Sequence, residues 1–203
     1  METTKKVLEK ALGQSGGLER PEILHMYIHL MDMSGQPERA IAVADNLCGL
    51  VPDAGHSNHM STHLDVLCGE YRQAVIWNTQ AIRVDDKYLA KVGPLNFYTL
   101  YRAHSHHFRL YAAMFCGQSW VALDTVSGLE ASIPEEKALY VESPLMADWL
   151  VWFLGMRFHE LIRFGWWKDV LALELTQNKD LFCVTTAMLR YGKGVASTAL
   201  GNV

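Results

Sequence analysis

The sequence predicts an all-α protein, built as a solenoid of about four helix pairs with an incomplete fifth. Apolar residues recur at three- and four-residue spacing after Pro21 and Pro37, which suit the first turn of a helix. Runs of alternating β-branched residues, which would indicate strands, are scarce. Glycines in predicted turns begin similar segments at regular intervals, as is typical of repeat proteins.

These segments are "GQPERA" at Gly35, "GEYRQA" at Gly69, "GQSWVA" at Gly117 and "GWWKDV" at Gly165. The first interval is 34 residues, the period of tetratricopeptide repeats. The next two are 48 residues, which we interpret as the same unit with additions in "KYLAKVGPLNFYTLYR" and "ASIPEEKALYVESPLMAD". We expect one domain over residues 1–203, with an N-terminal helix and loop in residues 1–20 and repeats from about residues 21, 55, 103, 151 and 187.

The composition is that of a globular protein, with half of the residues hydrophobic and a fifth charged. The net charge of −4 gives no indication of binding to nucleic acid or to an anionic membrane. No apolar run reaches the roughly 18 residues that a membrane-spanning helix needs. The four cysteines have no paired spacing, so we expect reduced thiols and a cytoplasmic protein.

Histidines recur at fixed distances before the aligned glycines. These distances differ by three, four and seven residues, so the positions share one face of each repeat's first helix. Equivalent positions become neighbours when repeats stack, which predicts a patch of imidazoles. The residues are His25, His59 and His107 ten positions before the glycine, Glu22, His56, His104 and Trp152 thirteen before, and His29, His63, Tyr111 and His159 six before.

A metal site explains such a patch better than packing alone. Protonated imidazoles so close together would repel one another, and neutral ones need a partner for every ring nitrogen. A bound metal removes both difficulties. The alternative is that duplication of the repeat copied a packing histidine. The predicted metal ligands are His25, His29, His56, His59, His63, His104 and His107.

The ligand types narrow the choice of metal. Imidazole-rich sites suit copper, zinc, iron or nickel, whereas the absence of cysteine and the single carboxylate argue against iron–sulfur clusters, magnesium and calcium. The number of histidines exceeds what one ion uses, so copper or iron is favoured over zinc. A three-histidine centre with an open position and a two-metal centre both fit, and an iron site built around Glu22 is a weaker third choice.

Other residues at the aligned positions are candidates for catalysis or substrate binding. Glu22 or Tyr111 could transfer protons, although Tyr111 could equally be an ordinary groove residue. Trp152 is expected to form an apolar wall of a substrate pocket that also includes His159 and Arg163. Arg163 could hold an acidic group of the substrate, or lie on the surface.

The segments "PEILHMYIHL", "AGHSNHMSTHLDVLCGEYRQA" and "LNFYTLYRAHSHHFRLYAAMFCGQSWVAL" resemble a group of tetratricopeptide-like, histidine-rich proteins of fungi and bacteria. The usual pattern of that group is H-x-x-x-H, H-x-x-H-M-P-S-H and H-x-x-H-F, and the seven predicted ligands match its histidines. The similarity covers most of residues 20–203 and departs at Ser61 and Thr62, where the pattern has proline and serine. The resemblance implies that the histidines face a concave groove, but it implies no reaction.

We therefore expect a metal-dependent enzyme, an oxidoreductase acting on a small organic molecule in this groove. One alternative is a non-catalytic scaffold that binds a peptide or protein, although such grooves usually carry Lys, Arg and Asn. A second alternative is a zinc-dependent hydrolase or lyase. The expected partners are a small-molecule substrate, no nucleic acid and no membrane, with homodimer formation through the C-terminal helix, which lacks a partner helix after Gly201.

Overall fold

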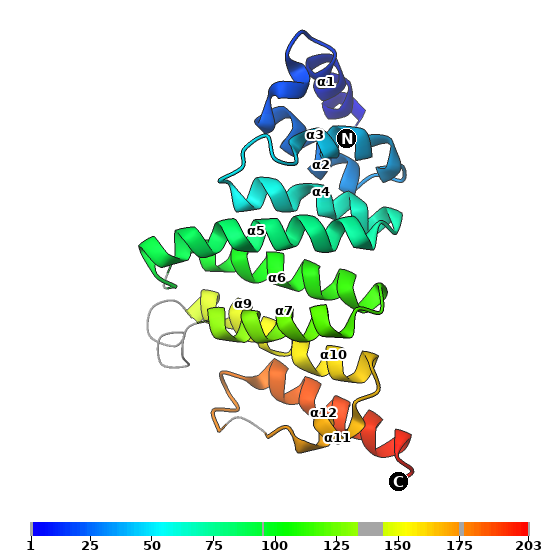
Figure 1. Ribbon diagram of the computed structural model, residues 1–203, viewed down its shortest axis with the longest axis vertical. Coiled ribbons are helices and arrows are strands. Elements are labelled where there is room, and N and C mark those ends of the chain that lie inside the picture. Colours follow the sequence, from blue (N-terminus) through cyan, green and yellow to red (C-terminus); the bar gives the residue numbers. More distant parts are fainter. Residues whose placement is uncertain (1, 95, 134–143, 175–176, 203) are drawn as a thin grey trace. The chain divides into compact units, whose positions relative to one another are not determined.

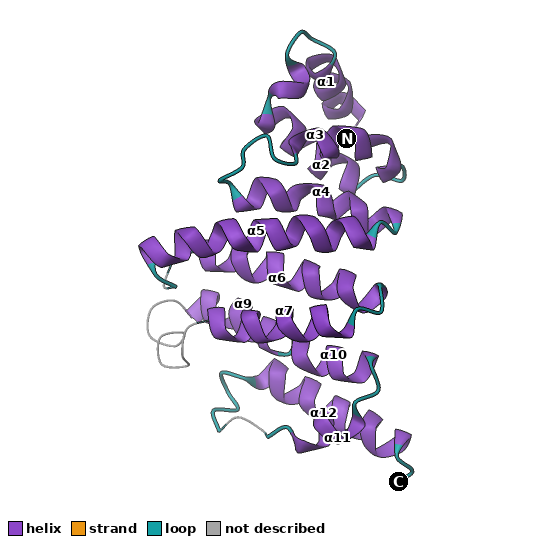
Figure 2. Ribbon diagram, viewed as in Figure 1, coloured by secondary structure: helices purple, strands orange, loops and turns teal. Residues whose placement is uncertain are grey.

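The computed structural model describes residues 2–94, 96–133, 144–174 and 177–202. Within these residues every secondary-structure element is a helix and no strand occurs, which confirms the predicted all-α class (Figures 1 and 2). None of the helices described is long and apolar enough to cross a membrane. Most of the predicted linker "ASIPEEKALYVESPLMAD" lies outside the described residues.

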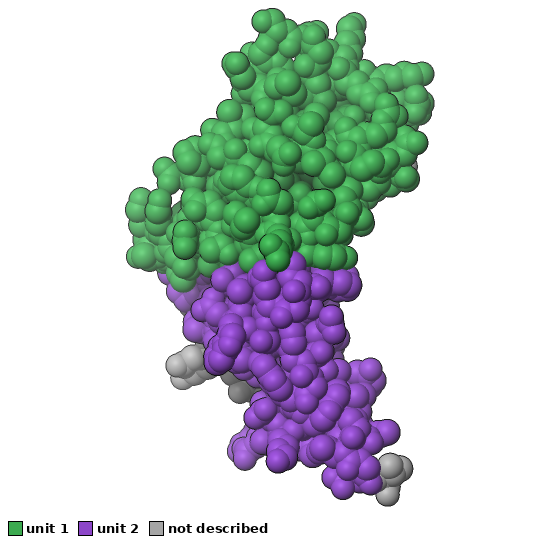
Figure 3. Space-filling model, turned by 45° about the vertical axis from the view of Figure 1, so that its right-hand side comes forward, with its two compact units in different colours: residues 1–91 green, residues 92–203 purple. Residues whose placement is uncertain are grey.

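The chain forms two compact units, residues 1–91 and 92–203 (Figure 3). In both units, consecutive helices pack against each other, α2 on α3 and α6 on α7 for example. The helices of unit 1 are α1 (Glu2–Leu12), η1 (Gly17–Glu19), α2 (Pro21–Asp32), η2 (Pro37–Ala40), α3 (Ile41–Leu47), α4 (Gly55–Cys68) and nearly all of α5 (Tyr71–Val92). Those of unit 2 are α6 (Tyr98–Phe115), α7 (Ser119–Ser132), α9 (Pro144–Leu154), α10 (Met156–Arg163), α11 (Trp167–Ala172) and α12 (Cys183–Ala199).

A core cluster of unit 1 is made by residues of α2, η2, α3 and α4. Leu24, Ile28 and Met31 recur at helical spacing in α2 and are fully buried. Met60 and Leu64, one turn apart in α4, are fully buried in the same cluster. Burial of these five side chains contributes on the order of 2 kcal/mol each, relative to leaving them in water. Their packing fixes how each helix is rotated about its axis.

This rotation decides where the histidines of unit 1 lie. In α2, His25 and His29 each follow a core residue, and in α4, His59 and His63 each precede one. Successive helical residues are rotated by about 100°, so these side chains lie beside the apolar stripe. The apolar core therefore brings the histidine-bearing faces of the two helices next to each other.

The helix that carries most of these histidines ends at a glycine that the repeat alignment singled out. Gly69 has φ 84°, a left-handed conformation that favours glycine. The N–H of Glu70 donates to the carbonyl of Asp65 (2.8 Å) and the N–H of Gly69 to that of Val66 (3.4 Å), which is the Schellman motif. Positive φ at the end of a helix recurs at the aligned glycines Gly117, Gly165 and Gly201.

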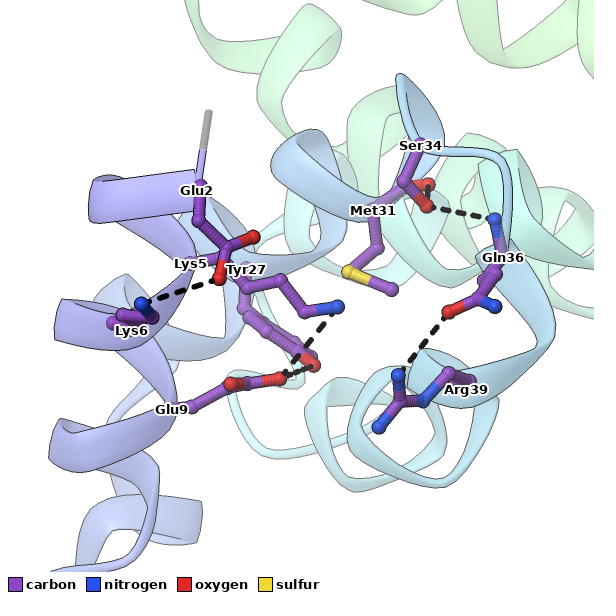
Figure 4. Close-up of polar contacts among 9 residues, drawn as sticks. All are labelled: Glu2, Lys5, Lys6, Glu9, Tyr27, Met31, Ser34, Gln36 and Arg39. Atoms are coloured by element: carbon purple, nitrogen blue, oxygen red, sulfur yellow. Dashed lines mark hydrogen bonds and ion pairs between the residues drawn. The ribbon is translucent and has the colours of Figure 1, made fainter.

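The first aligned glycine differs, because side chains close the turn after α2 (Figure 4). The hydroxyl of Ser34 donates to the carbonyl of Met31 (2.8 Å) and accepts the N–H of Gln36 (3.1 Å). Arg39 donates to the side-chain oxygen of Gln36 (3.1 Å). Gly35 therefore needs no left-handed conformation, and its φ is not positive.

The start of α4 is packed closely against α5. Gly55, the first residue of α4, is buried, and a Cβ there would overlap Oδ1 of Asp85. Asp85 is almost fully buried. A carboxylate at a helix N-terminus is stabilised by the helix dipole and by backbone N–H groups that lack an intrahelical acceptor. The absence of a side chain at Gly55 therefore lets α5 approach the N-terminus of α4.

We predict that Gly55→Ala lowers the free energy of unfolding by about 1–3 kcal/mol, because the added methyl group must displace the buried Asp85 carboxylate. Urea denaturation measures the change. Gly35→Ala is the matched control, since a Cβ there meets no atom within 4 Å; it should change the free energy of unfolding by less than about 0.5 kcal/mol. Equal stabilities for the two variants would show that the approach of Asp85 is not tight.

Unit 2 contains a buried carboxyl group in α10. Glu160 is fully buried, and neither of its carboxylate oxygens has a hydrogen-bond partner in the described part of the protein. Burial raises the pKa of Glu160 to about 7, against the opposing effect of Arg157. Arg157 donates two hydrogen bonds to the Glu130 carboxylate, from Nε (2.8 Å) and from Nη2 (2.7 Å). The Glu160 carboxyl therefore changes charge near neutral pH.

We predict that Glu160→Gln alters the pH dependence of stability. The folded protein holds the Glu160 proton more tightly than the unfolded chain does, so this group makes the protein less stable as pH rises from about 4.5 to about 7. Relative to the wild type, the variant should therefore gain thermal stability over that range and keep a constant advantage above it. The measurement is the melting temperature of both proteins from about pH 5 to pH 8. Parallel profiles would contradict the prediction.

Candidate metal centre

Five histidines of unit 1 lie together and form what we call the imidazole cluster, His25 and His29 of α2 with His56, His59 and His63 of α4. The ring centroids of His25 and His56 are 5.1 Å apart and those of His29 and His63 are 5.9 Å apart. Along each helix, the ring centroids are 4.8 Å apart for His25 and His29 and 4.9 Å apart for His59 and His63. Because the paired histidines follow the same order in both helices, α2 and α4 run in the same direction here.

Three members of the cluster could hold a metal ion. One ring nitrogen from each of His25, His29 and His56 lies within 4.8 Å of the other two. The Nε2 atom of His25 is buried and has no hydrogen-bond partner among the residues that the structure describes. A neutral imidazole has one nitrogen with a lone pair, which a metal ion can accept. Three protein ligands would leave further coordination positions for water or a substrate.

Burial and mutual repulsion keep these three imidazoles neutral. Burial, followed by the nearby His25, His29 and His63, lowers the pKa of His56 to about 4. Burial and then His29 lower the pKa of His25. The pKa of His29 is also lowered by burial and by His63, with Asp32 acting in the opposite direction. At neutral pH all three are therefore in the form that binds metals.

The other two members are held by hydrogen bonds from outside the cluster. Nδ1 of the fully buried His59 lies 2.7 Å from Oδ1 of Asn78 in α5. The amide nitrogen of Asn78 donates to the carbonyl of Ala74 (2.8 Å). Nδ1 of His63 lies 3.4 Å from Oδ2 of Asp32, and this interaction lowers the pKa of the Asp32 carboxyl. In metal sites, a carboxylate or amide oxygen usually accepts the N–H of the ring nitrogen that does not bind the metal. This hydrogen bond fixes the orientation of the ring.

The predicted histidines of unit 2 have an aromatic environment. The ring centroid of His107 is 5.1 Å from that of Trp152 and 5.8 Å from that of Phe153. Burial, with a smaller effect of His159, lowers the pKa of His107 to about 4. His104 is half-buried in α6 and His159 is exposed in α10. Trp152 therefore lies next to an imidazole, and its role as the wall of a substrate pocket stays a prediction.

The two predicted proton-transfer residues and Arg163 make only ordinary contacts near the surface. Glu22 is exposed and lies 3.8 Å from Arg20. Tyr111 is partly exposed, with its ring 4.7 Å from that of Phe115. The side chain of Arg163 is exposed and donates to a backbone carbonyl of α6 (3.1 Å). None of these contacts indicates a catalytic role.

Sequence reasoning missed Asp32 and Asn78, which both contact the cluster. Asp32 is three residues after His29, so helical spacing could have placed it on the same face. Asn78 is in a different helix from every histidine it approaches and leaves no signal in the spacing. The carboxylate at the cluster is therefore Asp32, a residue that the alignment of glycines does not highlight.

No protein-family model matches the chain, and comparisons with curated proteins and with solved structures found no similar protein. The imidazole cluster is therefore the basis on which we assign a function.

We predict that the metal-free protein loses stability on acidification because of the cluster. The folded-state pKa values of His25, His29 and His56 lie below the ordinary value of 6.5, so the unfolded chain binds more protons as pH falls. The contribution of His56 is fully present above about pH 6.5 and is lost progressively towards pH 4. The His56→Gln variant should therefore have a flatter stability profile over this range, measured by urea denaturation.

Ser57→Ala, one residue further along α4, is the control and should follow the wild-type profile. If the free energy of unfolding changes with pH equally in His56→Gln and in the wild type, burial does not lower the pKa of His56.

Proposed function

We propose that this protein binds a transition-metal ion at His25, His29 and His56 and uses it to oxidise a small organic molecule, with dioxygen as the electron acceptor. The observation that carries the proposal is the convergence of three neutral imidazoles from two helices. The buried Nε2 atom of His25 supports it. This atom has no hydrogen-bond partner in the described part of the chain, and such an atom destabilises the fold unless a ligand satisfies it.

Copper or iron is favoured over zinc. The described cluster offers five imidazoles, more than one ion takes, and imidazole-rich sites suit copper and iron as well as zinc. When bound, such a metal supplies electron transfer and polarises a ligand at its open position. The protein's own part is to hold the three rings through α2 and α4. Asp32 contacts Nδ1 of His63, so its ionised carboxylate would hold that ring in place beside the metal.

We further propose that the helix pairs are repeats of a tetratricopeptide-like solenoid. In support, α2 and α4 begin 34 residues apart, at Pro21 and Gly55. The matching order of the ring contacts means that these two helices run in parallel, as the first helices of successive repeats do. In this arrangement the imidazole cluster lines the face made by the first helices.

The proposal is tested by elemental analysis of the purified, tag-free protein. We expect at least about one equivalent of copper or iron, with an absorption band in the visible region. The double variant His25→Ala/His29→Ala should lose the metal and the band while keeping the helical circular dichroism signal. Met26→Ala, between the two on the exposed side of α2, should retain both.

Each other result has a definite meaning. Zinc alone, lost in the double variant, would keep the metal site but replace oxidation by zinc-dependent hydrolysis or elimination. Failure to take up copper, iron or zinc on reconstitution would overturn the metal site and leave the scaffold function in its place.

A further inference from the structure

Two ring nitrogens of the imidazole cluster lie in direct contact with each other. Nε2 of His59 and Nε2 of His63 are 3.1 Å apart, across one turn of α4. Such a contact between two imidazoles is favourable only when a positive charge, a proton or a metal ion, lies between two lone pairs, or when one ring donates. The partners of the other two ring nitrogens decide which case applies.

For His59 that partner is the amide of Asn78. The amide nitrogen already donates to the carbonyl of Ala74 (2.8 Å), so its oxygen is the atom directed at Nδ1 of His59 (2.7 Å). The hydroxyl of Thr62, 3.4 Å from the same Nδ1, donates to the carbonyl of His59 (2.6 Å) and also presents an oxygen to the ring. Both neighbours accept, so the proton of neutral His59 is on Nδ1 and its lone pair is on Nε2.

For His63 the partner is a carboxylate. Oδ2 of Asp32 is 3.4 Å from Nδ1 of His63, and an ionised carboxylate can only accept a hydrogen bond. Neutral His63 therefore also has its proton on Nδ1 and its lone pair on Nε2. Asn78 and Asp32 thus leave the lone pairs of both rings on the two Nε2 atoms that are 3.1 Å apart.

We propose that His59 and His63 form a second metal position beside the first, with Asn78 and Asp32 as positioning residues. Two imidazole nitrogens bound to one tetrahedral ion at ~2.0–2.1 Å are about 3.3 Å apart, close to the separation found here. Ring centroids of His56 and His59 are 6.1 Å apart and those of His29 and His63 are 5.9 Å apart, so the two positions are neighbours. This inference rests on the proposed function and extends it to a two-metal centre.

The test is a titration of the metal-free whole chain with Zn(II). Isothermal titration calorimetry measures the binding, and elemental analysis gives the number of zinc ions bound per chain. Zinc is the probe because it is redox-silent and allows the histidine nitrogens to be followed by NMR. The wild type should bind two equivalents. His63→Ala should bind one, and Asn78→Leu should bind the second equivalent about 10–100-fold more weakly.

Two further variants separate positioning from folding. Asn78→Asp keeps an acceptor at Nδ1 of His59 and should restore the affinity for the second equivalent, whereas loss of packing alone would not be repaired in this way. Asn46→Ala, an exposed amide of α3, should bind both equivalents like the wild type.

Nitrogen-15 NMR of the histidines shows directly which ring nitrogens carry a proton and which bind zinc. On addition of zinc, Nε2 of His59 and of His63 should move to the metal-bound range while both Nδ1 atoms keep their protons. A persistent N–H at either Nε2 would instead assign the contact to a shared proton and overturn the second position.

The number of zinc ions bound distinguishes failure of the second metal position from failure of the proposed function. One equivalent in the wild type, unchanged in His63→Ala and Asn78→Leu, would overturn the second position and leave the first. Binding of no zinc at all would overturn both.

Discussion

The packing of α2 against α4 is the constraint on which the rest of unit 1 depends. Leu24 and Ile28 of one helix and Met60 and Leu64 of the other are fully buried in one cluster, which fixes the rotation of both helices. The rotation of the helices then fixes the directions of the polar side chains next to these positions. The histidines gather because the apolar residues pack, and the cluster needs no attraction between the imidazoles themselves.

That arrangement has an electrostatic consequence. Imidazoles brought together at the edge of an apolar core lose water and repel one another when charged, which lowers the pKa of His25, His29 and His56. Neutral rings then require acceptors for their N–H groups, and Asn78 and Asp32 supply two of them. Nε2 of His59 and Nε2 of His63 then lie 3.1 Å apart, and one ring nitrogen from each of His25, His29 and His56 lies within 4.8 Å of the other two. Core packing and desolvation thus bring ring nitrogens together and, for His25, His29 and His56, favour the neutral form.

Much of this could be predicted from the sequence, because it depends on local spacing. The helical class follows from apolar periodicity, and the left-handed turn at Gly69 follows from its place after a helix. Pairing of His29 with His63 follows from their equivalent positions, but His25 contacts His56, which is one turn away from its equivalent. Contacts between helices also depend on how far one is shifted along the other, which spacing does not encode. Asn78 reaches His59 from another helix, so only tertiary structure reveals it.

Histidines that only pack and histidines that bind a metal differ in how they affect the stability of the metal-free fold. A packing histidine is stable once each nitrogen has a partner, and an apolar residue of similar size can often replace it. Here Nε2 of His25 is buried and has no hydrogen-bond partner among the described residues. This feature lowers the stability of the metal-free chain and does not improve its packing. Binding of a metal ion at that nitrogen would reverse the loss, since a ligand that binds only the folded state stabilises it by mass action. This buried nitrogen is therefore the feature that most favours the proposed role of His25 as a ligand over a role in packing alone.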